Sequence, residues 1–185
     1  MNGPAIEPSA IVEDGAAIGS GSRVWHHAHV RSGAKIGERC VLGKNVFVDT
    51  GVFIGDDVKI QNNVSVFNGV RIESEAFIGP SVVFTNDLLP RSAGGWSTVP
   101  TLVDHGASIG ANATVVCGNR LGRWSVVAAG AVVTTSVAPH QVVAGNPARH
   151  HGWACRCGEI VSRAEPYPAG MACPRCHEVL PETSP

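Results

Sequence analysis

The chain of 185 residues contains few aromatic residues and almost no net charge. It has five Phe, four Trp and one Tyr, and its 14 Lys and Arg nearly balance 15 Asp and Glu. A near-neutral chain lacks the basic surface that binds nucleic acid or an anionic membrane, so we expect neither partner. An apolar run of about 18 residues is also missing, so we expect no transmembrane helix. The first residues lack the basic and apolar regions of a secretory signal, which predicts a cytoplasmic, soluble protein.

Aliphatic residues recur instead at every sixth position. They occupy each multiple of six from Ile6 to Ile78, Phe84 follows in the same phase, and the residue four positions later is small or Val. The phase breaks after Phe84 and resumes with aliphatic residues from Val103 to Val133. The chain therefore consists mainly of hexapeptide repeats with one interruption.

A period of six excludes a helix, because 3.6 residues per turn would scatter the aliphatic side chains around the cylinder. Short strands separated by sharp bends satisfy the pattern, since each strand can point one aliphatic and one small residue inward. Three hexads then make one triangular coil, and the 22 glycines suit its corners. The repeat predicts an all-β fold, a hexapeptide-repeat parallel β-helix. The alternative is an all-β sandwich with coincidental spacing.

The interruption predicts an excursion loop over residues 85–102. The segment is rich in Pro, Gly and Ser, and long loops on rigid scaffolds usually carry function. Asn86 and Asp87 stand where the chain leaves the coil, and Arg91 lies further out. The functional interpretation competes with a solvated loop that packs on a neighbouring subunit.

Four segments, at residues 24–37, 59–72, 77–92 and 107–118, carry a closer resemblance. The motifs QNNVSV and FTND-x-x-PR within them resemble the nucleotide-linked 3-amino-sugar N-acetyltransferases, in particular those that act on UDP-2-acetamido-3-amino-2,3-dideoxyglucuronic acid for bacterial surface polysaccharides. The resemblance covers roughly residues 5–150.

This resemblance implies a left-handed β-helix and a homotrimer whose active sites lie between subunits. It implies acetyl-CoA as co-substrate and a UDP- or dTDP-linked amino sugar as acceptor. Asn86 corresponds to the asparagine of the family's FTND motif. Leu89 replaces a frequent Tyr, and His105 stands where the family has Lys or Arg, so the acceptor sugar stays open.

The implied reaction is attack of a sugar amine on a thioester, which needs proton removal and donors for the oxyanion. Asn86 does not titrate and would orient the amine or donate to the oxyanion. His105 titrates near neutrality and is the candidate base. The alternatives are that His105 is a solvated corner residue and that the substrate amine needs no protein base.

Five residues are candidates for binding the acceptor. The guanidinium groups of Arg31 and Arg91 match a pyrophosphate or a uronate carboxylate. Gln61 and Asn63 offer amides for base or sugar hydroxyls, although stacked asparagines at coil corners are equally a structural device. Asp87 joins this set as the neighbour of Asn86.

The segment 126–149 resembles the end of the superfamily's repeat, where backbone amides meet the pantetheine arm. It makes Gly130, Asn146, Pro147 and Arg149 the candidate cofactor residues, with Arg149 facing a phosphate.

The C-terminal tail carries paired cysteines. Cys155-x-Cys157 precedes Cys173-x-x-Cys176, which approximates a zinc ribbon with four cysteine ligands, although the first pair is one residue short. Paired cysteines of a cytoplasmic protein more often bind metal than form disulfides. We therefore expect a structural zinc ion with no open coordination position.

These patterns divide the chain into a β-helix acyltransferase domain, residues 1–150, and a zinc-ribbon-like tail, residues 151–185. Two other functions fit the fold. A non-enzymatic scaffold would not bind CoA. A β-helix carbonic anhydrase would need three histidines to converge on one metal ion, whereas His26, His27 and His29 lie far along the sequence from His105.

Overall fold

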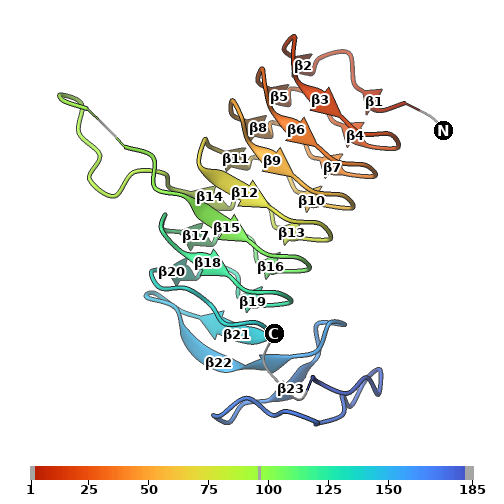
Figure 1. Ribbon diagram of the computed structural model, residues 1–185, viewed down its shortest axis with the longest axis vertical. Coiled ribbons are helices and arrows are strands. Elements are labelled where there is room, and N and C mark those ends of the chain that lie inside the picture. Colours follow the sequence, from red (N-terminus) through yellow and green to blue (C-terminus); the bar gives the residue numbers. More distant parts are fainter. Residues whose placement is uncertain (1–2, 96, 182–185) are drawn as a thin grey trace.

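The computed structural model describes residues 3–95 and 97–181, and its elements are all strands stacked into a β-solenoid (Figure 1). This confirms the all-β hexapeptide-repeat fold. Within the described residues, no helix exists that could cross a lipid bilayer.

The strands form three faces, and each parallel pair joins residues one coil apart. The ten-stranded first face comprises β1 (Ala5–Ile6), β4 (Arg23–Val24), β7 (Val41–Leu42), β10 (Lys59–Ile60), β13 (Phe77–Ile78), β16 (Ser108–Ile109), β19 (Val126–Val127), β21 (Gln141–Ala144), β22 (Arg149–Ala154) and β23 (Ile160–Ser162). The seven-stranded second face comprises β2 (Ile11–Val12), β5 (His29–Val30), β8 (Phe47–Val48), β11 (Ser65–Val66), β14 (Val83–Phe84), β17 (Thr114–Val115) and β20 (Val132–Val133). The six-stranded third face comprises β3 (Ala17–Ile18), β6 (Lys35–Ile36), β9 (Phe53–Ile54), β12 (Val70–Ile72), β15 (Thr101–Val103) and β18 (Arg120–Leu121).

Three rows of turns join the faces. We call the turns from the first to the second face the first corner, those from the second to the third face the second corner, and those that return to the first face the third corner. Asn45, Asn63 and Asn112 of the first corner adopt left-handed backbone angles, which Asn tolerates better than most residues.

The core is a single column of aliphatic side chains inside the prism. The last residue of each two-residue strand from β4 onward is almost fully buried, as Val24, Ile60 and Ile109 illustrate. The small residues four positions later, such as Ala28 and Cys40, fill the corners. The hexad pattern therefore predicted the inward positions correctly.

A loop interrupts the solenoid between two coils, and two antiparallel strands follow its C-terminal end. The chain leaves the solenoid after β14 and returns at β15, and the segment between them projects from the second corner (Figure 1). At the other end, β22 pairs with β21 in antiparallel orientation and β23 pairs with β22. Because β22 spans residue 150, the tail continues the first face of the solenoid.

Candidate functional site

Asn86 lies at the neck of the projecting loop. Its carbonyl oxygen accepts a hydrogen bond from the amide of Val99 at 2.9 Å, which closes the loop where it leaves the solenoid. Its side-chain Nδ2 donates to the carbonyl oxygen of Asn68, one coil away, at 3.4 Å. A side chain attached to two coils in this way has a defined orientation, and its Oδ1 has no partner among the described residues.

The neck borders a hollow of about 410 Å³ on the second corner. Asp87 shapes its outer wall, because its Oδ1 accepts the amide hydrogen of Leu89 at 2.8 Å. Arg91 donates from Nη1 to the carbonyl oxygen of Pro90 at 2.8 Å and is otherwise exposed. The lining residues are Asp49, Phe67, Asn86, Asp87, Pro90 and Arg91. The structure thus brings three residues predicted from the sequence, Asn86, Asp87 and Arg91, around one space.

Arg31 lies one coil before Asp49, a lining residue of this hollow, and forms an ion pair with it. Its Nη1 donates to Asp49 Oδ1 at 3.0 Å, and its Nε lies 3.7 Å from Glu13 Oε1. Burial alone would raise the pKa of Asp49, but the amides of Thr50 and Asn68 and the Arg31 guanidinium together hold that pKa below its usual value. Asp49 is therefore a fixed negative charge, and Arg31 is engaged with carboxylates of its own chain.

The sequence analysis did not name three of the lining residues, Asp49, Phe67 and Pro90, and the first two come from other coils. Asp49 and Phe67 occupy the same place in the coil as Thr85, the residue before Asn86, at separations of 18 residues. Three hexads make one coil, so this spacing was the signal that could have identified them. Phe67 also packs against Phe47, with ring centroids 5.9 Å apart.

Gln61 and Asn63 lie on a different edge of the prism, the first corner. The Oδ1 of Asn63 accepts a hydrogen bond from Asn45 Nδ2 at 2.9 Å, and Asn63 has a left-handed backbone angle. Asn63 therefore has a structural part in the corner ladder. Within one chain, these two residues do not line the hollow beside Asn86.

His105 lies on the third corner, two residues after the end of β15. Its Nε2 is 3.7 Å from Glu75 Oε2, and its ring meets the Trp124 ring edge-on with centroids 5.1 Å apart. It lines a second hollow, also of about 410 Å³, with Glu73, Ser74, Leu102, Asp104, Arg120 and Arg123. The two predicted catalytic residues, Asn86 and His105, thus line separate hollows of one chain.

The four predicted cofactor residues gather near β20. The amide of Val132 donates to the carbonyl oxygen of Gly145 at 2.9 Å, and the amide of Ala148 donates to the carbonyl oxygen of Val132 at 2.8 Å. The turn with Asn146 and Pro147 is thereby held against the coil end that begins with Gly130. Gly130, Asn146, Pro147 and Arg149 are all exposed.

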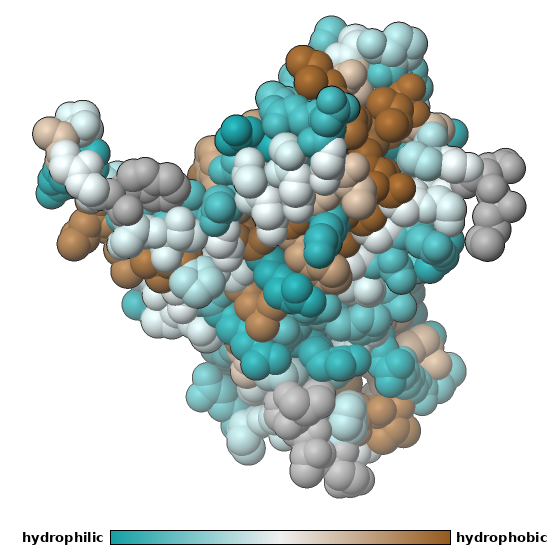
Figure 2. All heavy atoms as spheres, turned by 45° about the horizontal axis from the view of Figure 1, so that its top comes forward, coloured by the Kyte–Doolittle hydropathy of each residue, from teal (hydrophilic) through white to brown (hydrophobic). Residues whose placement is uncertain are grey.

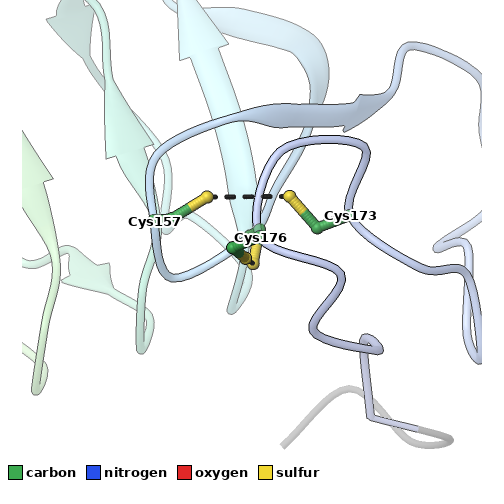
Figure 3. Close-up of side chains that lie close together, drawn as sticks. Cys157, Cys173 and Cys176 are labelled. Atoms are coloured by element: carbon green, nitrogen blue, oxygen red, sulfur yellow. Dashed lines mark hydrogen bonds between the residues drawn. The ribbon is translucent and has the colours of Figure 1, made fainter.

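The four tail cysteines form a compact group. Their sulfur atoms all lie within 4.8 Å of one another, with Cys155 Sγ 3.5 Å from Cys176 Sγ and Cys157 Sγ 3.6 Å from Cys173 Sγ. Figure 3 shows the sulfurs of Cys157 and Cys173 pointing toward each other. All four are free thiols. Zinc–sulfur bonds of about 2.3 Å in a tetrahedron separate the sulfurs by roughly 3.8 Å, so this set fits the ion.

The electrostatics at Cys173 also suit a metal ligand. Burial would raise the pKa of its thiol, but the backbone amides of Cys176 and Arg175 and the neighbouring thiols outweigh it and lower the pKa to about 7. The thiolate is the form that binds metal. His177, which follows the last cysteine, is exposed and not part of this group.

Comparisons with known proteins identify the repeat. A family model described as the GMPPB C-terminal domain matches residues 24–99, and one described as the hexapeptide repeat of succinyl-transferase matches residues 101–135. A 57-residue stretch is 47% identical to dTDP-3-amino-3,6-dideoxy-alpha-D-galactopyranose 3-N-acetyltransferase of Aneurinibacillus thermoaerophilus, covering 31% of this chain and 30% of that protein. A 72-residue stretch is 39% identical to 2,3,4,5-tetrahydropyridine-2,6-dicarboxylate N-acetyltransferase of Staphylococcus aureus, covering 39% and 28%. The chain therefore spans less than a third of the length of these curated relatives.

Solved structures give the same assignment. A hexapeptide-repeat acetyltransferase of Vibrio cholerae, complexed with acetyl coenzyme A, is 30% identical with a TM-score of 0.51, over 60% of this chain and 69% of that one. A variant of GDP-perosamine N-acetyltransferase of Caulobacter crescentus, with CoA and GDP-perosamine bound, is 22% identical and shares the fold with a TM-score of 0.53, over 82% of this chain and 57% of that one. With its hexad repeats, solenoid and projecting loop, the chain belongs to the hexapeptide-repeat acyltransferases.

Proposed function

We propose that this chain transfers an acetyl group from acetyl-CoA to the amino group of a UDP- or dTDP-linked amino sugar. The observation that carries the proposal is the hollow at the neck of the loop, where an amide side chain, a fixed carboxylate and an aromatic ring converge. The sugar-nucleotide N-acetyltransferases among its relatives support this choice of substrate class.

The chemical step requires that the attacking amine is correctly oriented and that its proton is removed. The amine nitrogen attacks the acetyl carbonyl carbon, the carbon–sulfur bond breaks, and the CoA thiolate leaves and takes up the proton that the nitrogen loses. Asn86 cannot take that proton, because its amide does not titrate usefully. Since Nδ2 donates to Asn68, we assign Oδ1 as the acceptor that aligns the attacking amine.

The other residues in and beside the hollow also suit a nucleotide-linked amino sugar. Arg91, which has an exposed guanidinium, would pair with the pyrophosphate or a sugar carboxylate. Phe67 offers an apolar ring against which a sugar or base could pack. Asp49 and Asp87 would attract the amine in its ammonium form before it loses a proton. Arg31 would act through Asp49, by holding that carboxylate in place.

The proposal includes a homotrimer, because one chain separates its candidate groups. Asn86, Gln61 and His105 lie on the second, first and third corners, so a neighbouring copy would have to bring the first or third corner to the hollow beside Asn86. The base role of His105 depends on such a neighbour. The exposed group at Gly130, Asn146, Pro147 and Arg149 would contact acetyl-CoA.

We further propose that the cysteine group holds one structural zinc ion. Four thiolates would fill a tetrahedral site and leave no position for substrate, so the ion would supply stability and take no part in the transfer. Elemental analysis of the purified chain should find about one zinc per chain. A metal-free chain with disulfides between these cysteines would contradict this part.

The transferase proposal is tested by CoA thiol release with a panel of UDP- and dTDP-linked amino sugars. Asn86→Ala should lower turnover about 100-fold, the usual order for losing one such group. It should leave the oligomeric state and acetyl-CoA affinity nearly unchanged. Asn86→Asp keeps an oxygen acceptor but removes the donor, so it should retain more activity than Asn86→Ala if Oδ1 aligns the amine.

One matched control completes this test. Asn119→Ala makes the same chemical change at a second-corner asparagine whose Nδ2 also donates to a backbone carbonyl, that of Val116, but which lines neither the hollow beside Asn86 nor the one beside His105. It should leave turnover of the folded protein close to normal. Thiol release that depends on no member of the panel would contradict the substrate class, and near-normal turnover of Asn86→Ala would contradict the site.

A further inference from the structure

The tail touches the solenoid through the arginine inside its first cysteine pair. Arg156 lies between Cys155 and Cys157, and its Nη2 is 3.0 Å from Glu178 Oε1. Its guanidinium carbon stands 5.7 Å from the centre of the Trp124 ring on the third corner, within the range of a cation–π contact. Arg156 of the first cysteine pair is thus in contact with Trp124 of the repeat.

Trp124 in turn forms a wall beside His105. The two rings meet edge-on at 5.1 Å, and the amide of Trp124 donates to the carbonyl oxygen of His105 at 3.1 Å. Gly106 leaves room for the indole, because a Cβ on that glycine would overlap atoms of the Trp124 ring. The Trp124 ring therefore limits the positions that the His105 imidazole can occupy.

Arg156 is held from both halves of the tail. It belongs to the first cysteine pair, whereas Glu178 follows the second pair and its carbonyl oxygen accepts the amide of Cys173 at 2.8 Å. A metal ion bound by all four sulfurs would join the two pairs. Without an ion, these four free thiols provide no covalent link between them.

A second contact runs along the same seam. The buried His140 donates its amide to the carbonyl oxygen of Arg123 at 2.8 Å, and its Nδ1 lies 2.9 Å from the carbonyl oxygen of Ala154. Arg123 and Trp124 are adjacent in the third corner. The contact of Arg156 with Trp124 and the hydrogen bonds of His140 with Arg123 and Ala154 therefore connect this one turn to the residues around the first cysteine pair.

We infer that metal binding by the tail cysteines sets the position of the His105 imidazole, through Arg156 and Trp124. Arg156 and Trp124 are then positioning residues for the hollow lined by His105, and the metal content of the tail regulates that hollow. The inference rests on the metal site of the proposed function and does not require acetyl transfer.

The test uses the full chain and follows the ring protons of His105 by NMR, assigned from their absence in His105→Gln. An edge-on indole displaces such resonances strongly, and Trp124→Leu supplies the reference for a His105 without it. Zinc content is measured on every sample. Chelation of the zinc-loaded chain should move the His105 resonances toward the Trp124→Leu positions by more than their line width.

Arg156→Gln should produce a displacement in the same direction while zinc content stays at one per chain, and Arg156→Lys should recover part of it. The matched control is Arg175→Gln. Arg175 occupies the corresponding place in the second cysteine pair, its side chain has no partner among the described residues, and its loss should leave the His105 resonances unmoved.

Unchanged His105 resonances in the metal-free chain would overturn the inference, as would unchanged resonances in zinc-loaded Arg156→Gln. A chain that takes up no zinc would overturn it together with the metal site. In each case the thiol-release assay still decides the transferase proposal independently.

Discussion

The two ends of the solenoid are built from the same hexads but differ in what covers them. At the N-terminal end, the inward-pointing Ile6 is 44% exposed, and hydrophobic side chains are visible at this end of the molecule (Figure 2). At the C-terminal end, the corresponding Val127 is 1% exposed, and β21, β22 and β23 extend its sheet beyond it. The repeat supplies the apolar residue in each coil, but the next layer determines whether it is buried.

This difference has a physical consequence. Full burial of an aliphatic side chain contributes about 1.5–3 kcal/mol, and a half-exposed one contributes correspondingly less. At the C-terminal end, β21 covers Val127 and is itself covered by β22, which leads into a tail with few buried apolar residues and the four proposed zinc ligands. We therefore expect the covered end to depend on metal and the open end not to.

The largest expected effect follows from removing the proposed zinc ion. Metal binding contributes on the order of 10 kcal/mol to the folding of small zinc modules. Chelation should therefore abolish the hydrogen-exchange protection of the tail amides, including those of Cys155 and Cys173, and weaken protection at Val143. Amides of the first coils serve as the internal control and should not change. Equal protection of the tail with and without metal would contradict the comparison.

A smaller effect is expected from truncating an inward-pointing isoleucine, either in the buried core or at the N-terminal end. Ile109→Ala removes a completely buried side chain between two coils and should cost about 2–5 kcal/mol. Ile6→Ala acts on a half-exposed side chain and should cost less than about 1.5 kcal/mol. Urea unfolding of both variants gives the two values. Similar costs would mean that the open end is covered in solution.

The sequence predicted these inward positions well, because a period of six leaves one orientation for each aliphatic residue. It predicted less of the site. Asn86 was identified from the broken phase, whereas Asp49 and Phe67 required residues to be counted by whole coils. The contact of Arg156 with Trp124 has no periodic signal at all, since it joins an irregular tail to one corner. Which corners of neighbouring copies meet depends on assembly, which the repeat alone does not specify.

A third comparison concerns two glycines with the same backbone angle. Gly106 and Gly51 have φ of 70° and 72°, so alanine at either position meets the cost of a left-handed backbone, about 1–2 kcal/mol. A Cβ on Gly51 would meet open space, whereas one on Gly106 would overlap Trp124. Overpacking of this kind costs roughly 1–3 kcal/mol more. Gly106→Ala should have a lower midpoint temperature of thermal unfolding than Gly51→Ala. The reverse order would argue against the packing of Trp124 at the covered end.

The smallest effect concerns pH and His140, which lies in the seam between the tail and the last coil. Burial lowers the pKa of His140 below its ordinary 6.5, and Arg156 and Arg123 act in the same direction, while the Ala154 carbonyl and Glu178 oppose them. As the pH falls below about 6.5, the unfolded chain takes up a proton that the folded chain does not, so the free energy of unfolding decreases. The contribution is fully present above that pH. One such proton limits the slope to about 1.4 kcal/mol per pH unit. Urea unfolding between pH 7.5 and 5.5 should therefore show a steeper loss for the natural chain than for His140→Gln, whose amide can still donate to Ala154. Protonation of the tail thiols affects both proteins alike and cancels in the difference, so parallel slopes would show that His140 is not buried in the seam.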